Sequence, residues 1–475
     1  MPAVLIGQKS FFIFLVVVLL GYHLLRGRTA KYAFLLAASW VFYAAISPYY
    51  LWVIWLLTGI DYHVGRKIEA ETDDHKRKRW LVVSVVSNLG LLVAFKYTVF
   101  FWDTGVAVAN LFADVPPRAW DILLPLGISF HTFQGISYTV DIYRRQIKAV
   151  DSKLDYALFV SFFPQMAAGP IVRAVEFLPQ MAMPPVPTAQ QIQDGTFLFA
   201  RGLFKKLVIA DQLDLLFVSA VFNDPSAYSA VACRWAVLAW AVQIYCDFSG
   251  YSDIAVGVAK WFGFELPLNF HLPYLATSIA DFWRRWHLSL SSWLRDYLYF
   301  PLGGSRGSTV RIYFNLMLVF VLCGLWHGAT WAWLAYGVYN GLLMSLYRVF
   351  DQALKGYDWS RRLRASQPWA VFAWLATFGQ LLFGLILVRM TGWSNGAAML
   401  EGVLGLGEGA KLVPATVPLL VMLGLAGHGW ELVRERLPRL AWSWDPLRAV
   451  NAAACLAAVA IFSPGVSKTF IYIQF

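Results

Sequence analysis

The chain has 475 residues, of which 59% are hydrophobic, 17% aromatic and 14% charged, and its 39 Lys and Arg residues against 28 Asp and Glu residues give a net charge of +11. Globular proteins carry about a quarter charged residues, and the apolar residues of this chain fall in long runs, so disordered, fibrous, coiled-coil and water-soluble proteins are excluded. The composition predicts an all-α polytopic membrane protein. In such a protein excess Lys and Arg lie in cytoplasmic loops, and no nucleic-acid partner is expected.

Apolar runs separated by basic loops predict the membrane segments of the first part of the chain. These predicted segments are 11–25, 31–46, 49–60, 80–102 and 121–141. Basic stretches at 26–31, 66–79 and 144–153 follow the first, third and fifth of them, so these loops are predicted to be cytoplasmic. No small-residue cleavage site follows the first run, which favours a retained span over a secretory signal.

The next apolar segment, 155–172, contains Pro164, Gly169 and Pro170. Such helix breakers are tolerated at membrane depth only where protein or a polar cavity satisfies the backbone, so a re-entrant segment is predicted. The following segment, 194–222, is predicted to bend from the interface into a span. A return span is then predicted at 231–246 and ends at a polar stretch with the sequence DFSGYSD.

The remaining spans are predicted at 312–326, 329–347, 369–390, 413–430 and 449–463. At ~20 residues per full span, the chain is predicted to form a single membrane-embedded domain, 1–475, with roughly 10–13 membrane segments. The alternation of basic loops places the C-terminal tail, 463–475, outside the cytoplasm.

His327 stands out among the eight histidines because of the depth at which the predicted topology places it. If Arg311 and Arg348 both lie at the cytoplasmic face, His327 is 16 residues from one and 21 from the other, or roughly 24–32 Å of helix. An ionisable side chain at that depth faces a protein interior or a water-filled cavity. A functional histidine is predicted, with a core histidine bonded to a backbone carbonyl as the alternative. His131 also lies inside a predicted span, and its role stays open.

A basic amphipathic region covers 277–311. At helical spacing Trp283 and His287 lie on one stripe of this region. Its arginines include three cations suited to phosphate groups, Arg284, Arg285 and Arg295. An interfacial helix anchored in lipid headgroups explains the same pattern, so the residues alone leave both interpretations open.

Neither a disulfide framework nor a metal site is indicated. The four cysteines, Cys233, Cys246, Cys323 and Cys455, lie in apolar stretches without C-x-x-C spacing, which predicts buried thiols. The sequence contains no HExxH, so a metalloenzyme interpretation has no support. No metal cofactor is therefore expected.

Three stretches resemble a known family. They are FFPQMAAGPIVR at 162–173, CGLWHGATWAWLAYGVYNG at 323–341, and the run 245–304, which contains YCDFSGYSDIAVG and DFWRRWHLSLSSWLRDYL. They are similar to the membrane-bound O-acyltransferase (MBOAT) family, in particular to its bacterial AlgI-like branch of alginate O-acetylation proteins. The resemblance implies a ring of helices around a central tunnel, which joins a cytoplasmic acyl donor to an acceptor on the other face.

The resemblance also assigns roles to residues. His327 corresponds to the family's catalytic histidine, and His287 corresponds to a second active-site position that is His or Asn in the family. His327 would take the proton of an acceptor hydroxyl, while His287 would orient the acyl group or stabilise charge. The implied acyl donor is acetyl-CoA, whose phosphates the arginines of the 277–311 region would bind.

The tail ends in KTFIYIQF. A short apolar tail of this kind is ordinarily an anchor at the membrane interface. This ending also resembles the C-terminal aromatic motif of relay members of the branch, in which a tyrosine hydroxyl receives the acyl group transiently. By that resemblance Tyr472 is an acyl-relay residue supplied by His327.

The resemblance as a whole implies an acetyltransferase of the cell inner membrane, embedded in membrane lipid. It would move acetyl from cytoplasmic acetyl-CoA towards an exported polysaccharide, alginate first, through a periplasmic SGNH-type acetyltransferase and the polysaccharide biosynthesis machinery. Acetylation of cellulose or peptidoglycan, or D-alanyl transfer from a carrier protein, is an alternative within the same chemistry. A transporter or channel with a polar midline is an alternative of another class, and a scaffold without activity is a third.

Overall fold

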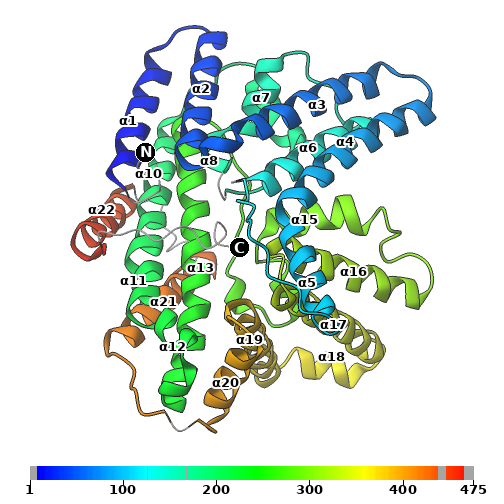
Figure 1. Cartoon of the computed structure of the whole chain (residues 1–475). Coiled ribbons are helices and arrows are strands. Elements are labelled where there is room, and N and C mark those ends of the chain that lie inside the picture. Colours follow the sequence, from blue (N-terminus) through cyan, green and yellow to red (C-terminus); the bar gives the residue numbers. More distant parts are fainter. Residues whose placement is uncertain (1–7, 126, 167–168, 408, 437–444, 465–475) are drawn as a thin grey trace. The chain divides into compact units, whose positions relative to one another are not determined.

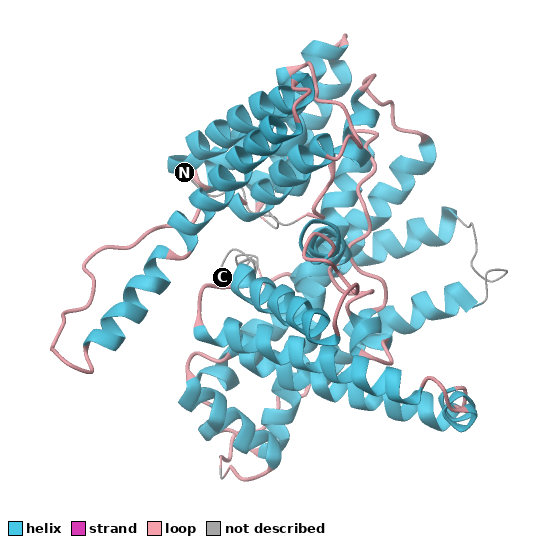
Figure 2. Ribbon diagram, turned by 90° about the vertical axis from the view of Figure 1, so that its right-hand side faces the viewer, coloured by secondary structure: helices cyan, strands magenta, loops and turns pink. Residues whose placement is uncertain are grey.

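The structure is a computed structural model that describes residues 8–125, 127–166, 169–407, 409–436 and 445–464 (Figure 1). These residues form helices joined by loops, and no β-strand occurs among them (Figure 2). The predicted all-α class is therefore confirmed. The chain divides into two compact units, Met1–Phe199 with Ala255–Pro267 and Ala200–Ile254 with Leu268–Phe475, and the single domain expected from the sequence stays a prediction.

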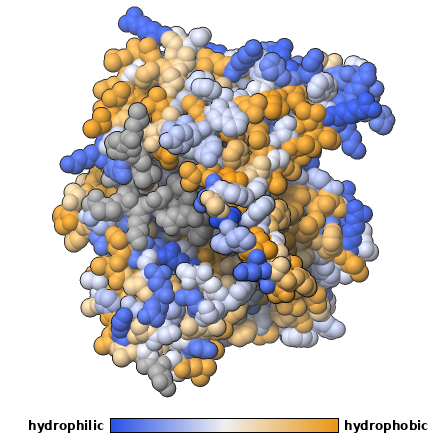
Figure 3. Space-filling model, viewed as in Figure 1, coloured by the Kyte–Doolittle hydropathy of each residue, from blue (hydrophilic) through white to orange (hydrophobic). Residues whose placement is uncertain are grey.

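Several helices have the length and apolarity that a membrane span requires. Within the described residues four can cross a membrane by these criteria: Arg28–Ile46, Asp74–Lys96, Thr309–His327 and Gln367–Arg389. Shorter apolar helices are Lys9–Leu24, Thr98–Ala109, Thr416–Gly429 and Arg448–Phe462. Hydrophobic side chains cover much of the face seen in Figure 3, and Val16, Val41, Val86, Phe314 and Phe372 are 55–62% exposed on five different helices. An outer surface of this kind suits contact with lipid.

The first unit contains ten helices of the described chain, the last of which continues into the second unit. They are α1 (Lys9–Leu24), α2 (Arg28–Ile46), α3 (Leu51–Ala70), α4 (Asp74–Lys96), α5 (Thr98–Ala109), α6 (Ile128–Tyr143), α7 (Lys153–Ser161), α8 (Phe163–Met166), α9 (Ala174–Phe177) and α10 (Ala189–Leu203), with 3₁₀ turns η1 (Pro48–Tyr50) and η2 (Leu178–Met181). Helices α3, α4 and α6 pack side by side (Figure 1).

The interface of α3, α4 and α6 is polar at its centre. The Asp61 carboxylate, which is fully buried, accepts hydrogen bonds from Ser84 Oγ at 2.6 Å and Asn88 Nδ2 at 2.9 Å. His131 on α6 is also buried, and its Nε2 lies 3.1 Å from Thr58 Oγ1 on α3. These contacts stabilise three apolar helices against one another, because buried polar groups in apolar surroundings need partners.

Two predicted spans of this unit differ from the structure. The segment predicted at 80–102 is split, because α4 ends at Lys96 and α5 begins at Thr98. The span predicted from 121 begins only at Ile128. The irregular stretch before it contains Pro116, Pro117 and Pro125, which remove backbone donors and prevent an earlier helix start. The apolar segment with the three helix breakers is interrupted as predicted between α7 and α8, while its re-entrant path stays a prediction.

The second unit carries the remaining elements. They are the π-helical η3 (Phe204–Ala210), η4 (Asp214–Val218) and η7 (Arg295–Tyr299), the 3₁₀ turns η5 (Pro225–Ala227) and η6 (Pro273–Leu275), and α11 (Asp211–Leu213), α12 (Ser219–Asn223), α13 (Ala230–Trp261), α14 (Ile279–Phe282), α15 (Leu288–Leu294), α16 (Thr309–His327), α17 (Trp331–Leu354), α18 (Asp358–Arg364), α19 (Gln367–Arg389), α20 (Trp393–Leu404), α21 (Thr416–Arg436) and α22 (Asp445–Phe462). The last residues of α13 belong to the first unit.

Helix α13 does not end at the polar DFSGYSD stretch, contrary to the prediction. Asp247 and Asp253 in that stretch form ion pairs with Lys206 Nζ at 2.5 Å and Arg201 Nη2 at 2.9 Å. Lys206 Nζ also lies 2.9 Å from Asp211 Oδ1. Because the carboxylates are paired, they do not need water, and the helix continues through them.

Helices α16 and α17 form an antiparallel hairpin that sets up the functional site. Their backbones touch at Gly324, where a Cβ would lie only 2.4 Å from the Trp333 carbonyl oxygen and 2.9 Å from Gly337 Cα. Small residues at a helix crossing permit this close approach. Thr330 caps α17, since its side chain accepts a hydrogen bond from the Trp333 backbone N–H at 3.3 Å. The hairpin thereby fixes His327, the last residue of α16, against the first turn of α17.

Candidate functional site

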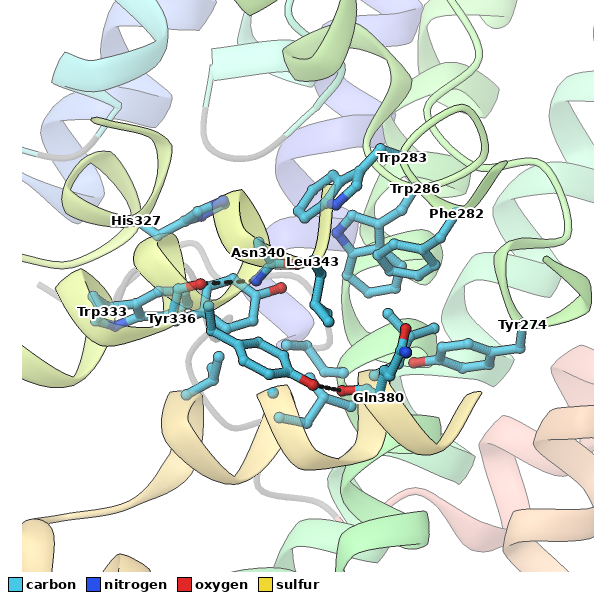
Figure 4. Close-up of a pocket in the computed structure, with 16 residues that line it drawn as sticks. Tyr274, Phe282, Trp283, Trp286, His327, Trp333, Tyr336, Asn340, Leu343 and Gln380 are labelled. Carbon is cyan, nitrogen blue, oxygen red and sulfur yellow. Dashed lines mark hydrogen bonds between the residues drawn. The ribbon is translucent and has the colours of Figure 1, made fainter. Parts of the chain in front are cut away.

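His327 lines a cavity in the second unit (Figure 4). Its side chain is 7% exposed, and its ring stacks on Trp333 with the ring centroids 5.1 Å apart and the planes at 23°. Aromatic residues from several elements form much of the wall: Tyr274, Phe282, Trp283, Trp286, Trp333, Tyr336 and Tyr339. The histidine singled out from the sequence therefore faces a protein cavity.

The cavity at His327 is small. Its free volume is ≈ 40 Å³, and a single water needs roughly 10–15 Å³ by the same measure. By this measure the space has room for a few water-sized groups.

His287 is completely buried at the start of α15. Its backbone is left-handed, with φ 47° and ψ 55°, a conformation that non-glycine residues adopt at a cost of roughly 1–3 kcal/mol and that clusters at functional sites. This conformation breaks the helix between α14 and α15. The continuous helical stripe of Trp283 and His287 predicted from the sequence is therefore wrong.

Asn269 sets the tautomer of His287. Its Oδ1 lies 3.0 Å from His287 Nδ1 and also accepts hydrogen bonds from Ser289 Oγ at 3.0 Å and the Ser289 backbone N–H at 3.4 Å. Because a backbone N–H only donates, this amide atom is the oxygen and His287 Nδ1 carries the hydrogen. The Nε2 atom of the neutral ring therefore carries the lone pair.

Sequence reasoning missed Asn269. The residue lies in an irregular stretch after α13, and its Nδ2 donates to Ser252 Oγ on α13 at 3.1 Å. Its backbone oxygen accepts from Leu288 N at 2.9 Å. The only sequence signal was an amide between two apolar residues in PLNFH. That signal does not identify its partner, because His287 lies 18 positions further along the chain.

The two predicted catalytic histidines lie next to each other. Their ring centroids are 6.5 Å apart, and Trp326 packs against both rings at 6.3 Å from His287 and 4.8 Å from His327. Burial lowers the pKa of the His287 imidazole well below its usual range, and the neighbouring His327 adds to this shift. His287 is thus a neutral imidazole beside His327, and it is not one of the described residues that line the cavity.

The predicted donor-binding arginines lie elsewhere in the same unit. Arg285 pairs with Asp281 at 3.0 Å and lines a separate cavity with His271. Arg295 pairs with the adjacent Asp296 at 2.7 Å. The exposed Arg284 donates from Nε to the Ala280 carbonyl at 3.2 Å. None of the three is among the described residues that line the His327 cavity, and their role in donor binding stays a prediction.

Two further expectations concern the tail and metal ligands. Tyr472, the predicted acyl-relay residue, lies outside the described residues. Among the residues that are described, no three His, Cys, Asp or Glu side chains gather into a group that could hold a metal ion. The four cysteines are free thiols, three of them buried and Cys455 partly exposed.

The sequence was compared with known proteins. Residues 143–388 match the membrane-bound O-acyltransferase (MBOAT) family. The chain is 37% identical to the probable alginate O-acetylase AlgI of Pseudomonas aeruginosa over 80% of this chain and 72% of that protein, and 36% identical to the peptidoglycan O-acetyltransferase of Helicobacter pylori over 83% and 78%. It is 29% identical to the teichoic acid D-alanyltransferase of Bacillus subtilis over 57% and 70%. The family match covers half of the chain, and the relatives are similar over most of their length. The chain therefore belongs to the membrane-bound O-acyltransferase family.

Proposed function

We propose that this acyltransferase moves acetyl groups from cytoplasmic acetyl-CoA across the inner membrane for O-acetylation of an exported polysaccharide. The observation that carries the proposal is the buried His327 facing a small aromatic cavity. Relatives named as alginate and peptidoglycan acetylating enzymes support the reaction class. Alginate is the first candidate acceptor, and peptidoglycan and cellulose are alternatives of the same chemistry.

In this proposal His327 is the catalytic base. Its imidazole takes the proton of the acceptor hydroxyl as the hydroxyl oxygen attacks the thioester carbonyl. The new C–O bond forms, the C–S bond breaks, and the departing thiolate receives the proton from the imidazolium. The face of Trp333, at 5.1 Å between ring centroids, stabilises the imidazolium in the interval. The aromatic wall excludes water, which would otherwise hydrolyse the thioester.

His287 would act through its neighbour. Its Nδ1–H donates to Asn269 Oδ1, so the lone pair of the neutral ring is on Nε2. This lone pair favours positive charge nearby. When His327 accepts the proton, this lone pair lowers the energy of the imidazolium relative to an apolar surrounding. Asn269 is then a positioning residue, because it holds the tautomer that makes His287 an acceptor.

The lining of the His327 cavity favours acetyl over D-alanyl. D-Alanyl carries an ammonium group, and no carboxylate stands among the described lining residues to pair with it. Acetyl transfer therefore ranks above D-alanyl transfer, which the Bacillus subtilis relative performs by its name.

The product would leave through the C-terminal tail. The alternation of basic loops supports an extracytoplasmic tail, and the Tyr472 hydroxyl would receive acetyl from the His327 site as an ester. A periplasmic SGNH-type transferase would then take the acetyl group to the polymer. This relay separates the cytoplasmic thioester from an acceptor that is too large to enter the cavity.

The test is acetyl transfer by purified protein in nanodiscs. Wild type, His327→Ala, Tyr472→Phe and the control His75→Ala, an exposed residue in the first turn of α4, receive labelled acetyl-CoA, and mass spectrometry follows the C-terminal peptide. Label on Tyr472 in wild type and His75→Ala but not in His327→Ala is expected. CoA release without a tyrosine adduct would remove the relay, and full activity of His327→Ala would remove the proposed base.

A further inference from the structure

The tautomer of His287 leaves one step of the proposed reaction without a hydrogen-bond donor. In acyl transfer the carbonyl oxygen of the thioester becomes negatively charged when the acceptor oxygen bonds to its carbon, and donors stabilise that charge. His287 Nδ1–H donates to Asn269 and its Nε2 carries the lone pair, so the neutral ring offers no N–H to this oxygen. His327 uses its basic nitrogen for the acceptor hydroxyl. The oxyanion therefore needs a donor from another side chain.

Several polar side chains line the His327 cavity, but most of their donors are already engaged. Tyr339 Oη and Tyr274 Oη each donate to a backbone carbonyl, at 2.9 Å and 2.5 Å, and Asn340 Nδ2 donates one hydrogen to a third at 2.8 Å. Trp283 differs from them. Its Nε1 is inaccessible to solvent and has no hydrogen-bond partner within the described part of the chain.

The Trp283 indole therefore brings a buried donor to the cavity. An indole nitrogen can only donate, and a buried donor that lacks a partner costs about 1–3 kcal/mol. Trp283 and His327 line the same cavity, and in Figure 4 the nitrogen edge of this indole faces the other lining side chains. An acceptor atom of a bound substrate would remove the cost. The acceptor that an acyl thioester carries at its reacting end is the carbonyl oxygen.

The surrounding structure holds the Trp283 ring in place. Trp283 follows directly after α14, and its backbone N–H donates to the Ile279 carbonyl at 3.2 Å. Ser278 caps the start of this short helix, because its hydroxyl accepts from the Asp281 backbone N–H at 3.1 Å. The indole packs against Phe320 on α16, with ring centroids 5.3 Å apart. A donor that is held in this way needs no reorganisation when charge develops.

The spacing along α16 suits a donor and a base on either side of one carbonyl group. Phe320, which contacts Trp283, lies seven residues before His327 on this helix, or ~10 Å along its axis. A base, an attacking oxygen, a carbonyl group and a donor in sequence span roughly 10 Å, since each non-bonded step is about 3 Å and the C=O bond about 1.2 Å. One carbonyl group can therefore meet both residues.

We propose that the Trp283 indole N–H is a catalytic hydrogen-bond donor to the thioester carbonyl oxygen of the acyl donor. The proposal rests on the proposed function and adds a residue to its site. As the acceptor oxygen bonds to the carbonyl carbon, His327 takes the hydroxyl proton, and the Trp283 N–H stabilises the negative charge on the carbonyl oxygen. The C=O bond then re-forms, the C–S bond breaks, and the departing thiolate takes the proton from His327.

The kinetic test removes the N–H and keeps an aromatic ring. Trp283→Phe, and a protein with benzothienylalanine at position 283, receive acetyl-CoA in nanodiscs; benzothienylalanine has a sulfur where the indole has its N–H. In both proteins kcat should fall by about 10²-fold, while KM and the Kd for unacylated CoA stay within about twofold of wild type. Wild-type kcat with benzothienylalanine would overturn the proposal, even if Trp283→Phe were slow because of the space that it leaves in the wall.

Trp293→Phe is the matched control. It removes an indole N–H from α15 in the same unit, and Trp293 is not among the described residues that line the His327 cavity. This variant should keep the kcat of wild type. An equal loss of kcat in Trp293→Phe and Trp283→Phe would show that the rate follows aromatic packing in general, and it would overturn the proposal.

Infrared spectroscopy separates the proposed contact from the proposed reaction. His327→Ala and His327→Ala combined with Trp283→Phe are each given acetyl-CoA that is labelled with ¹³C at the carbonyl. A hydrogen bond from Trp283 lowers the stretching frequency of this carbonyl, so the band of bound acetyl-CoA should lie lower in the single variant. If wild type transfers no acetyl but this difference is present, the reaction is wrong and the contact stands. Equal bands, or no binding of acetyl-CoA, would overturn the contact.

Discussion

The replacement Gly328→Ala tests whether Trp333 packing shapes the active cavity. Gly328 follows His327 and has extended backbone angles, φ −153° and ψ 137°, which alanine adopts freely. A Cβ there would lie 2.0 Å from Trp333 Cδ1 and 2.3 Å from its Nε1. Carbon atoms pack at about 3.5–4.0 Å, so the indole has to move by roughly 1.5 Å.

This movement would reach the chemistry directly. Trp333 stacks on His327 and forms part of the wall of a cavity of only ≈ 40 Å³. Because a misplacement of about 1 Å in an active site costs up to 10²-fold in rate, kcat should fall by about 10²-fold. The unfolding temperature should change little, since the Gly324 contact that joins α16 to α17 is untouched.

The assay measures the rate of acetyl transfer to the acceptor, or the rate of CoA-dependent acetyl exchange. Thermal unfolding is measured on the same preparations. Gly356→Ala is the matched control, because a Cβ at Gly356 meets nothing within 4 Å. Gly328→Ala combined with Trp333→Phe should regain part of the rate, since a smaller ring leaves room for the methyl group. Wild-type kcat in Gly328→Ala would refute the reasoning that Trp333 positions His327.

Three further predictions follow from the same geometry. His287→Asn should lower kcat in steady-state kinetics, because it removes the ring nitrogen whose lone pair would support positive charge on His327; an unchanged kcat would contradict this role. Asn269→Ala should reduce kcat more than Asn269→Asp, which keeps an oxygen for His287 Nδ1, as steady-state kinetics would show. Lys206→Met should destabilise the protein by about 3–5 kcal/mol, because it removes the lysine partner of two buried carboxylates, and adding Asp247→Asn should recover part of the unfolding temperature; an unchanged temperature in Lys206→Met would argue against the ion pairs.

Hydrophobic length could be read from the sequence because it depends on consecutive residues. The spans predicted at 312–326, 329–347 and 369–390 lie within α16, α17 and α19 to within a few residues. The depth of His327 in the membrane, inferred from these same spans and basic loops, stays a prediction. The start of α6 could not be placed as well, since the prolines before it override the apolar pattern.

The parts that were missed depend on partners far apart in the chain. The polar DFSGYSD stretch predicts the end of a helix, because the sequence does not reveal that Lys206 pairs with Asp247 in this stretch. The turn at His287 depends on Asn269, which holds it from an irregular segment that hydropathy does not reveal.

The ion pairs between α13 and the segment before it also bear on how the protein enters the membrane during synthesis. A single Lys or Asp in the middle of an inserting helix costs about 2.5–3.5 kcal/mol. Lys206 and Asp211 leave the ribosome before Asp247. For some forty residues of synthesis, therefore, Asp211 is available to pair with Lys206 but Asp247 is not. Insertion is most favourable when this segment waits at the translocon and enters the bilayer together with α13 as one helical hairpin.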